Sequence, residues 1–400
     1  DEGFTCGIDI SSDEKYFLIS TSDHVTSEIY FFNTNEINPK IKLFKKRQKE
    51  IRYSIDSWKE NFYIHTNLDA EDFKICKCKH DNIENWIDYV PPKQGVLVGG
   101  FNLLNEWMIR GEVRNALSKL YVRNLKSNKE EELNITSEKV IIPGVSLMQK
   151  DRNTNKIYVA YNSPKIPGKS YIYDIATKEK KIVKEDQVPS GHQPEDYIVQ
   201  RLNCDSHDGK KIPLTLTYHK KTKLDGSANL LLYAYGSYGS SMGPSFSPAR
   251  LSLINRDIIW VTAHIRGGME RGMSWWRDGK MLNKKNTFKD YISCAKFLIK
   301  NKYTSKGKII GMGGSAGGLL MGAAVNENPD LFLGMIMAVP FVDTLTTNLD
   351  HSLPLTVGEF NEFGNAKENK EHFNYIKSYS PYENIKKMDY PHIFITTSLS

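Results

Sequence analysis

The segment KIIGMGGSAGGLL at residues 308–320 decides the fold class of this chain. Apolar Ile309 and Ile310 lead into a cluster of glycines around Ser315, and a run of small and apolar residues follows at 319–325. This order predicts a strand, a tight turn and a helix, with Gly-x-Ser-x-Gly at the corner. Glycines on either side of the serine allow the strand and the helix to approach closely.

A strand–turn–helix corner of this kind exposes a serine hydroxyl at the end of a strand, and it is typical of α/β-hydrolases. The N-terminus of the following helix directs backbone N–H groups towards the position where an oxyanion would form. A phosphate-binding loop is the alternative, but such loops carry Gly-Lys-Ser/Thr or Gly-x-Gly-x-x-Gly at the start of the helix. The serine-centred spacing therefore favours Ser315 as a catalytic nucleophile.

The length and composition favour two domains without a membrane span. The chain has 400 residues, a net charge of +7 and five cysteines. Such sparse cysteines do not make a disulfide framework, so free thiols and a reducing, cytoplasmic location are expected. The basic cluster at 42–49 contains one aromatic residue, which favours a solvated loop or strand end over a nucleic-acid site. We predict no cofactor, no metal, and no nucleic-acid or membrane partner.

Residues 1–188 carry a repeat of strand-like segments. Runs rich in β-branched and aromatic residues begin at Lys15, Asn61, Glu106 and Lys156, and a second such run follows each. A spacing of roughly 45 to 50 residues fits the blades of a β-propeller, and an irregular β-sandwich is the alternative. Only about four units are present, at the low end for closed propellers. We therefore interpret residues 1–188 as the C-terminal blades of a propeller.

Residues 189–196 read PSGHQPED, a composition that predicts a linker. Strand-like and helix-like segments then alternate over 197–400, which predicts a doubly wound, mostly parallel sheet with helices on both faces. Asp208 and Gly209 predict a hairpin at its start, and apolar spacing predicts a helix over 287–301. The predicted fold is therefore an α/β-hydrolase domain that follows a partial all-β propeller domain.

Reactive side chains of such a sheet lie at the carboxyl ends of its strands. Tyr235 ends a predicted strand over 230–235, and the loop to Gly239 contains a second tyrosine, Tyr238. A phenol there either donates to an oxyanion or packs in a turn against the other domain. His264 precedes Ser315, whereas α/β-hydrolases carry serine, acid and histidine in that order, so His264 is expected to be structural. The acid would follow a strand that ends near Thr397. We therefore expect the domain to stop, at Ser400, before the triad aspartate and histidine, and this chain alone to be close to inactive.

Several segments match one known family when they are taken together in order. They read YGSYG at 235–239, HIRGG at 264–268, KKNTFKDY at 284–291, GGSAGG at 313–318 and VPFVD at 339–343. The chain thereby resembles the prolyl oligopeptidase family of serine peptidases, in its oligopeptidase B branch. The similarity is dense from about residue 230 onwards and weaker over the propeller half.

The resemblance implies a serine endopeptidase that cleaves short peptides after Arg or Lys through an acyl-enzyme, beneath a propeller that acts as a size filter. By family position Ser315 is the nucleophile, and the Tyr235 hydroxyl and the Ala316 backbone N–H form the oxyanion hole. Glu359 matches a family acid that binds the basic side chain preceding the scissile bond.

Three positions depart from the family pattern. Asn361 stands where close relatives often carry a second acid, and Gly243 and Ser245 stand where they carry acids. The resemblance therefore implies weaker discrimination for basic residues. An esterase or lipase on the same scaffold and a non-catalytic remnant are the alternatives, and Glu359 with a propeller cap favours cationic peptides over apolar acyl chains.

Overall fold

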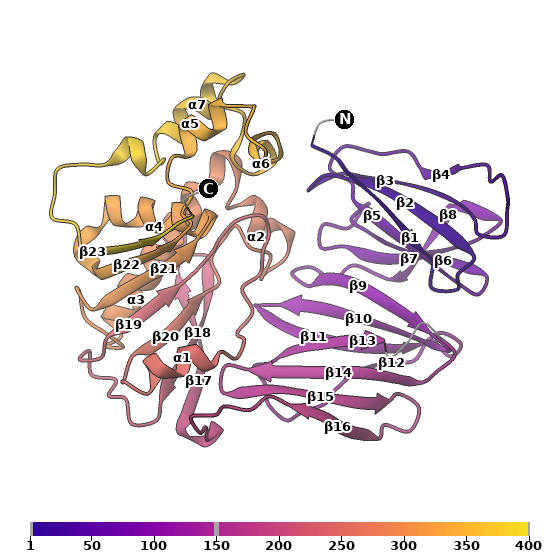
Figure 1. Ribbon diagram of the computed structural model, residues 1–400, viewed down its shortest axis with the longest axis horizontal. Coiled ribbons are helices and arrows are strands. Elements are labelled where there is room, and N and C mark those ends of the chain that lie inside the picture. The colour runs from indigo at the N-terminus through magenta and orange to yellow at the C-terminus, as the bar shows by residue number, and fades with distance from the viewer. Residues whose placement is uncertain (1–2, 148–151, 399–400) are drawn as a thin grey trace.

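The computed structural model describes residues 3–147 and 152–398 (Figure 1). Within these residues, four four-stranded sheets are followed by a seven-stranded sheet with helices around it. The predicted domain ends at residues 1 and 400 lie outside the described residues. No helix in the described ranges is long and apolar enough to cross a membrane.

Each of the first four sheets is an antiparallel array of strands that are consecutive in the sequence. The first contains β1 (Thr5–Ile10), β2 (Tyr16–Ser22), β3 (Ser27–Asn33) and β4 (Lys42–Lys45). The second contains β5 (Tyr53–Trp58), β6 (Asn61–Thr66), β7 (Lys74–Lys79) and β8 (Asn82–Val90). The third contains β9 (Leu97–Leu104), β10 (Trp107–Arg114), β11 (Leu117–Asn124) and β12 (Glu130–Glu132). The fourth contains β13 (Ile142–Leu147), β14 (Lys156–Ser163), β15 (Ile166–Asp174) and β16 (Lys180–Glu185).

The predicted repeat corresponds to the central hairpin of each of these sheets. The segments predicted near Lys15, Asn61, Glu106 and Lys156 form β2, β6, β10 and β14, and each pairs with the strand that follows it. Because every repeat forms a sheet of its own, the propeller prediction is confirmed and the sandwich alternative is wrong.

Apolar side chains between neighbouring sheets form the core of the propeller domain. Leu18, Ile29 and Phe31 of the first sheet belong to one buried cluster with Phe62 and Ile64 of the second. Each sheet therefore covers an apolar face of its neighbour, which is how a set of small sheets without helices buries its core.

The second domain contains one sheet with the strand order β17-β18-β20-β19-β21-β22-β23. These strands are β17 (Tyr197–Asp205), β18 (Lys211–His219), β19 (Leu230–Tyr233), β20 (Ile259–Ala263), β21 (Ile309–Gly314), β22 (Phe332–Ala338) and β23 (His392–Thr396). Pairing is antiparallel from β17 through β18 to β20 and parallel from β20 to β23. The predicted hairpin joins β17 to β18, and its Gly209 has a φ of 80°. A mostly parallel sheet is thereby confirmed.

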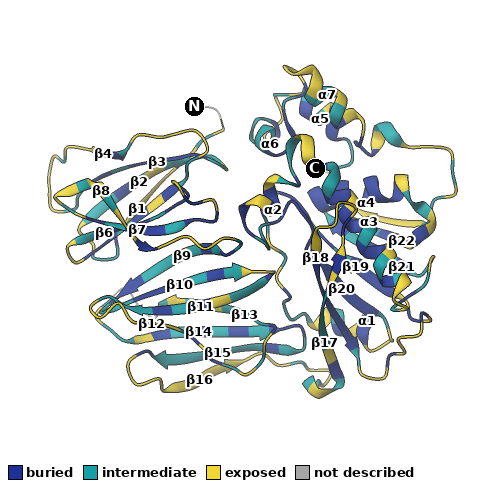
Figure 2. Ribbon diagram, turned by 180° about the vertical axis from the view of Figure 1, so that it is seen from behind, coloured by how far each residue is buried: buried dark blue, intermediate teal, exposed yellow. Residues whose placement is uncertain are grey.

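Helices cover both faces of this sheet, whose strands β18 to β20 are buried almost throughout (Figure 2). Leu230 and Leu232 belong to the cluster that includes the buried faces of α3 and α4, whereas Leu231 belongs to the cluster on the side of α1. This alternation follows from the two-residue period of a strand. The helices are α1 (Pro248–Ile254), α2 (Met273–Arg277), α3 (Lys285–Lys300), α4 (Ala316–Glu327), α5 (Thr344–Leu349), α6 (Thr356–Phe363) and α7 (Lys370–Lys377).

The predicted linker at 189–196 lies between β16 and β17, and it includes a short 3₁₀ turn at Pro194–Asp196. The division of the chain at 188 and 197 stays a prediction. Beyond this connection, the two domains meet along a seam (Figure 1). The carboxylate of Asp72, between β6 and β7, accepts hydrogen bonds from the backbone N–H of Gly95 and of Met273, each at 2.7 Å. The propeller is thereby joined to the first residue of α2.

Candidate active site

Ser315 occupies the turn between β21 and α4, as the sequence predicts. Its φ of 53° lies in a region that residues with a side chain rarely adopt, and the residue is exposed. The Ser315 N–H donates to the carbonyl of Ala338 at 2.9 Å, and its own carbonyl accepts from the N–H of Phe341 at 3.0 Å. The neighbouring strand and its loop therefore hold the strained turn in place.

Glycines are required at this turn because backbone atoms approach too closely for a side chain. A Cβ at position Gly313 would lie 2.3 Å from the carbonyl oxygen of Gly317. A Cβ at Gly318 would lie 2.4 Å from Cβ of Pro340. These contacts explain the glycine cluster of the sequence as the condition for packing α4 against its strand.

Tyr235, two residues after β19, reaches the turn from the neighbouring strand. Ser315 lies near its hydroxyl, and burial raises the pKa of the phenol more than Ser315 lowers it. Tyr235 therefore stays protonated at neutral pH and can donate a hydrogen bond. Ala316 is the first residue of α4, so its N–H has no acceptor within the helix. The structure thus brings the Ser315 hydroxyl and two hydrogen-bond donors together, which is the arrangement that acyl transfer needs.

A buried ammonium group holds the loop that carries Tyr235. Lys284 Nζ donates to the carbonyl of Gly236 at 2.7 Å and to Oγ of Ser237 at 2.5 Å. It also lies 3.5 Å from Glu362 Oε1, and Trp276 Nε1 donates to the other oxygen of that carboxylate at 2.8 Å. Burial lowers the pKa of Lys284, and the Glu362 charge opposes this shift. Because both charged groups are buried, the position of the loop depends on their pairing.

Glu359 lies on α6, and its partly buried carboxylate accepts a hydrogen bond from the Tyr238 hydroxyl at 2.6 Å. Burial raises the pKa of Glu359, and the nearby Glu362 charge raises it further. Tyr238 belongs to the same loop as Tyr235, and the centroids of the two rings are 6.2 Å apart. The structure therefore places the predicted substrate-binding acid beside the loop that reaches Ser315.

The positions that depart from the family pattern lie in two different places. Asn361 points to the propeller, where its amide donates to Asp23 Oδ2 at 3.4 Å. Gly243 and Ser245 line a separate cavity of about 510 Å³. A Cβ at Gly243 would lie 2.6 Å from Cδ1 of Ile142 in the propeller.

His264 is fully buried at the end of β20, and its ring contacts Thr215 and Arg201 rather than Ser315. Its Nε2 lies 2.8 Å from Oγ1 of Thr215 and 3.0 Å from Nη1 of Arg201. Burial and the Arg201 charge hold the pKa of His264 well below its usual value, so the ring is neutral. Within residues 3–147 and 152–398, no histidine forms a hydrogen bond with Ser315. The described part of the chain therefore does not place a histidine as a general base beside Ser315.

Two family models together match most of the chain. The prolyl oligopeptidase family model matches residues 244–400, and the model of the N-terminal β-propeller domain of prolyl oligopeptidase matches residues 1–186. The chain belongs to the prolyl oligopeptidase family. This membership confirms the resemblance seen in the sequence and the combination of a propeller with an α/β-hydrolase domain.

Similar proteins are longer than this chain. Dipeptidyl aminopeptidase BI of Pseudoxanthomonas mexicana is 38% identical over all of this chain and 55% of that protein. Protease 2 of Moraxella lacunata is 35% identical over all of this chain and 57% of that protein. The closed form of oligopeptidase B from Trypanosoma brucei with covalently bound antipain superposes with a TM-score of 0.94, at 32% identity, over 99% of this chain and 57% of that one. The chain thus spans just over half the length of these relatives.

Sequence reasoning assigned no role to Lys284 or Glu362 and no partner to Tyr238. Lys284 and Tyr238 stand within the segments that carry the family resemblance, but their partners lie 78 and 121 positions away in the sequence. One signal was available, because Glu359 and Glu362 are three residues apart and such residues share a face of a helix. That spacing indicates two neighbouring acids, without showing that only one of them has a buried lysine partner.

Proposed function

We propose that the protein containing this chain is a serine endopeptidase that cleaves short peptides after Arg or Lys. The observation that carries this proposal is Ser315 on a strained turn at the start of α4, next to the Tyr235 hydroxyl. Family membership supports it, as does the name of a similar structure, an oligopeptidase B with covalently bound antipain.

In this proposal Ser315 Oγ attacks the scissile carbonyl carbon and passes its proton to a general base. The base is a histidine outside the described residues, oriented by an acid, so this chain alone is close to inactive. The negative charge that develops on the carbonyl oxygen accepts hydrogen bonds from the Tyr235 hydroxyl and the Ala316 N–H. The amine leaves with the proton, and water then releases the acyl group from Ser315 by the same steps in reverse.

Glu359 provides the preference for a basic residue before the scissile bond. Charge-assisted hydrogen bonds to a guanidinium or ammonium group are worth about 1.5–3 kcal/mol each. One such interaction favours Arg or Lys over a neutral residue of similar shape by roughly tenfold to a hundredfold. Because Asn361 is neutral and contacts Asp23, this site discriminates less than one with two acids on α6.

The proposed partners are short peptides, which the propeller selects by size. No cofactor enters the proposed reaction, since serine, hydrogen-bond donors and a base suffice. A cytoplasmic location is part of the proposal. The five cysteines, four of them buried, are free thiols, which is consistent with a reducing compartment.

Hydrolysis by the full-length protein tests this function. We expect cleavage of an N-terminally blocked Arg-amide peptide and covalent labelling of Ser315 by a fluorophosphonate. Ser315→Ala should abolish labelling and lower kcat by about 10⁴-fold or more. Ser252→Ala, which removes an exposed hydroxyl on α1, serves as the matched control.

Three outcomes would contradict the proposal. Hydrolysis of a short acyl ester without cleavage of the Arg-amide indicates an esterase. Absence of labelling in the wild-type protein indicates a non-catalytic remnant. Cleavage only of peptides with a free amino terminus indicates an exopeptidase, the class named for the Pseudoxanthomonas mexicana relative.

A further inference from the structure

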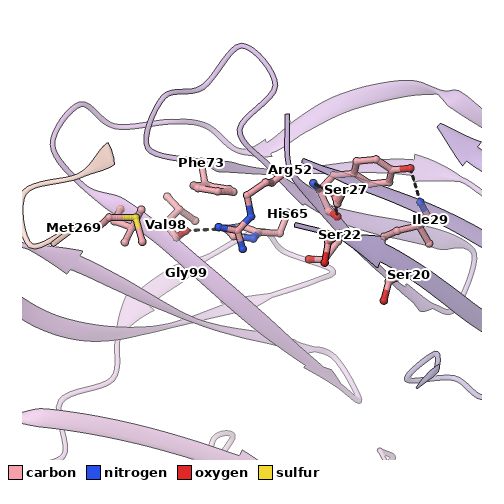
Figure 3. A pocket seen from close by; sticks show the side chains of 13 residues that line it. Ser20, Ser22, Ser27, Ile29, Arg52, His65, Phe73, Val98, Gly99 and Met269 are labelled. Carbon is pink, nitrogen blue, oxygen red and sulfur yellow. Dashed lines mark hydrogen bonds between the residues drawn. The ribbon is translucent and has the colours of Figure 1, made fainter. Parts of the chain in front are cut away.

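A cavity of about 360 Å³ lies among the first three propeller sheets and reaches the hydrolase domain at Met269 (Figure 3). Arg52, the residue before β5, lines this cavity. The side chains of Ser20, Ser22 and Ser54 also line it, and these hydroxyls make no hydrogen bonds within the described part of the chain. The cavity thus combines one guanidinium group with several hydroxyls that have hydrogen-bonding capacity to spare.

Arg52 has no carboxylate in an ion pair with it among residues 3–147 and 152–398. Its guanidinium carbon lies 5.9 Å from the centroid of the Phe73 ring. Burial lowers the pKa of Arg52, and the Asp23 charge opposes that shift. The Asp23 carboxylate itself accepts hydrogen bonds from the N–H groups of Val25 and Thr26, at 2.8 and 2.6 Å. Arginine stays charged at neutral pH in such surroundings, so Arg52 presents a positive charge to the cavity.

Among the described residues, the fully buried arginines are paired with carboxylates, whereas the half-buried Arg201 and Arg250 donate to backbone carbonyls instead. Arg110 lies within 2.7 Å of carboxylate oxygens from two glutamates, and Arg266 lies 2.6 Å from each of two aspartates. A half-buried guanidinium without such a partner retains the capacity to bind a carboxylate through two parallel hydrogen bonds. Arg52 is therefore arranged for a ligand rather than for holding the fold.

His65 beside it does not add to the positive charge. Its Nε2 lies 2.8 Å from the carbonyl oxygen of Val98, so this nitrogen carries a hydrogen and donates. The ring stacks on Phe73 with centroids 4.6 Å apart. Burial lowers the pKa of His65, and the Arg52 charge lowers it further. His65 is therefore neutral at neutral pH, and the charge of this part of the cavity comes from Arg52.

The cavity continues towards the candidate active site. Ser22 lines it and also lines a second cavity of about 220 Å³, which includes Gly358 and Asn361 on α6. Gly358 precedes Glu359, the proposed partner of the basic residue. Ser22 thus connects the cavity at the positively charged Arg52 with a cavity that α6, the helix of Glu359, helps to line. Asp23 and His24 also line that second cavity. A short peptide with a basic residue and a free carboxyl terminus has the complementary charges.

We propose that Arg52 binds the terminal carboxylate of the peptide substrate, and this inference rests on the proposed peptidase function. The guanidinium fork matches the two oxygens of a carboxylate, and the nearby serine hydroxyls can donate to the same group. With the basic residue at Glu359 and the carboxyl end at Arg52, the site selects peptides by the length between these two groups. Arg52 is thereby a specificity-determining residue contributed by the propeller.

Matched peptides of increasing length test the proposal in the full-length protein. Each peptide carries one Arg and is made as the free acid and as the terminal amide. At the length that reaches Arg52, we expect kcat/KM of the acid to exceed that of the amide by about tenfold. Arg52→Gln should reduce this ratio to about one, and Arg52→Lys should keep part of it. Lys178→Gln, which removes an exposed propeller charge, should leave the ratio unchanged.

A ratio near one at every length in the wild-type protein would overturn the proposal, as would an unchanged ratio in Arg52→Gln. Should that variant fail to fold, the wild-type length series and Arg52→Lys decide in the same way. Loss of Ser315-dependent cleavage of both the acid and the amide would instead refute the proposed function. If Arg52 also binds an acidic side chain, an amidated peptide that ends in Asp should have a kcat/KM close to that of the free acid. That result would support a carboxylate site at Arg52.

Discussion

The two sides of the domain seam use buried charge in opposite ways. On the hydrolase side, the Lys284 ammonium is buried with Glu362 and two further acceptors, and it holds the loop that carries Tyr235. On the propeller side, Arg52 faces a cavity without a carboxylate in an ion pair among the described residues. A paired buried charge stabilises one conformation, whereas a charge without an acidic partner is available to a ligand. The difference teaches that a buried positive charge can position a loop in one domain and stay open to a ligand in the other.

Removing the ammonium of Lys284 is the strongest way to break this comparison. Lys284→Met leaves Glu362 buried without its partner, and we expect a loss of about 3–5 kcal/mol in the free energy of unfolding. Denaturant unfolding of the full-length protein measures this loss. Lys289→Met, on the exposed face of α3, is the control. The double variant Lys284→Met/Glu362→Gln should recover part of the loss, and equal losses in Lys284→Met and the control would show that the pair does not hold the loop.

Glu270 provides a second test, because its carboxylate is buried at the seam and Oε2 has no hydrogen-bond partner among the described residues. Its Oε1 accepts from the N–H of Met242 at 2.8 Å, and its carbonyl accepts from the N–H of Ala116 in the propeller at 2.8 Å. Burial raises the pKa of Glu270 from 4.5 to about 7. Between these pH values the folded protein keeps the proton and the unfolded chain loses it. The contribution of Glu270 to stability therefore falls as the pH rises through this range.

The Glu270→Gln variant should remove that pH dependence. The amide oxygen still accepts from Met242, but the side chain no longer ionises. Relative to the wild type, we expect the variant to gain up to about 3 kcal/mol in the free energy of unfolding between pH 5 and pH 8. Unfolding at several pH values measures the difference, with Glu368→Gln as an exposed control. If the free energy of unfolding depended on pH in the same way in the wild type and in Glu270→Gln, the pH dependence would not come from Glu270.

Glu359 sharpens the comparison, since it is the proposed binding charge on the side where the Lys284–Glu362 pair positions a loop. Glu359→Gln should lower kcat/KM for Arg substrates by roughly tenfold to a hundredfold and leave neutral substrates unchanged. Burial raises the pKa of this carboxyl, so the wild-type preference for Arg should weaken as the pH falls through that raised pKa. The variant should lack this pH dependence. Glu371→Gln is the exposed control. If the preference for Arg survives in Glu359→Gln, the basic residue of the substrate does not bind at Glu359.

Local patterns in the sequence predicted the fold well. The glycine spacing around Ser315 predicted the turn, because close backbone approach leaves no choice of residue at Gly313. The apolar spacing over 287–301 predicted a helix, and α3 spans Lys285–Lys300. The repeated runs predicted one sheet per repeat, since each hairpin carries the two-residue period of a strand with one buried face.

Contacts between distant segments could not be predicted in the same way. Lys284 and Glu362 are 78 positions apart, and Met273 and Asp72 are 201 positions apart. No periodicity links such pairs, because the packing of whole domains brings them together. The resemblance to a family indicated roles for Tyr235 and Glu359, but the cavity at Arg52 became visible only with the propeller sheets in place.

The hydrogen bonds of Asp72 make one part of the seam between the domains costly to separate. Its buried carboxylate bonds to the N–H groups of Gly95 and Met273 at 2.7 Å each, and leaving either group unsatisfied costs about 1–3 kcal/mol. The bond between Asn361 and Asp23 is longer, at 3.4 Å, and only partly buried. Breaking the contact beside α6 therefore costs less than breaking the contact at Asp72.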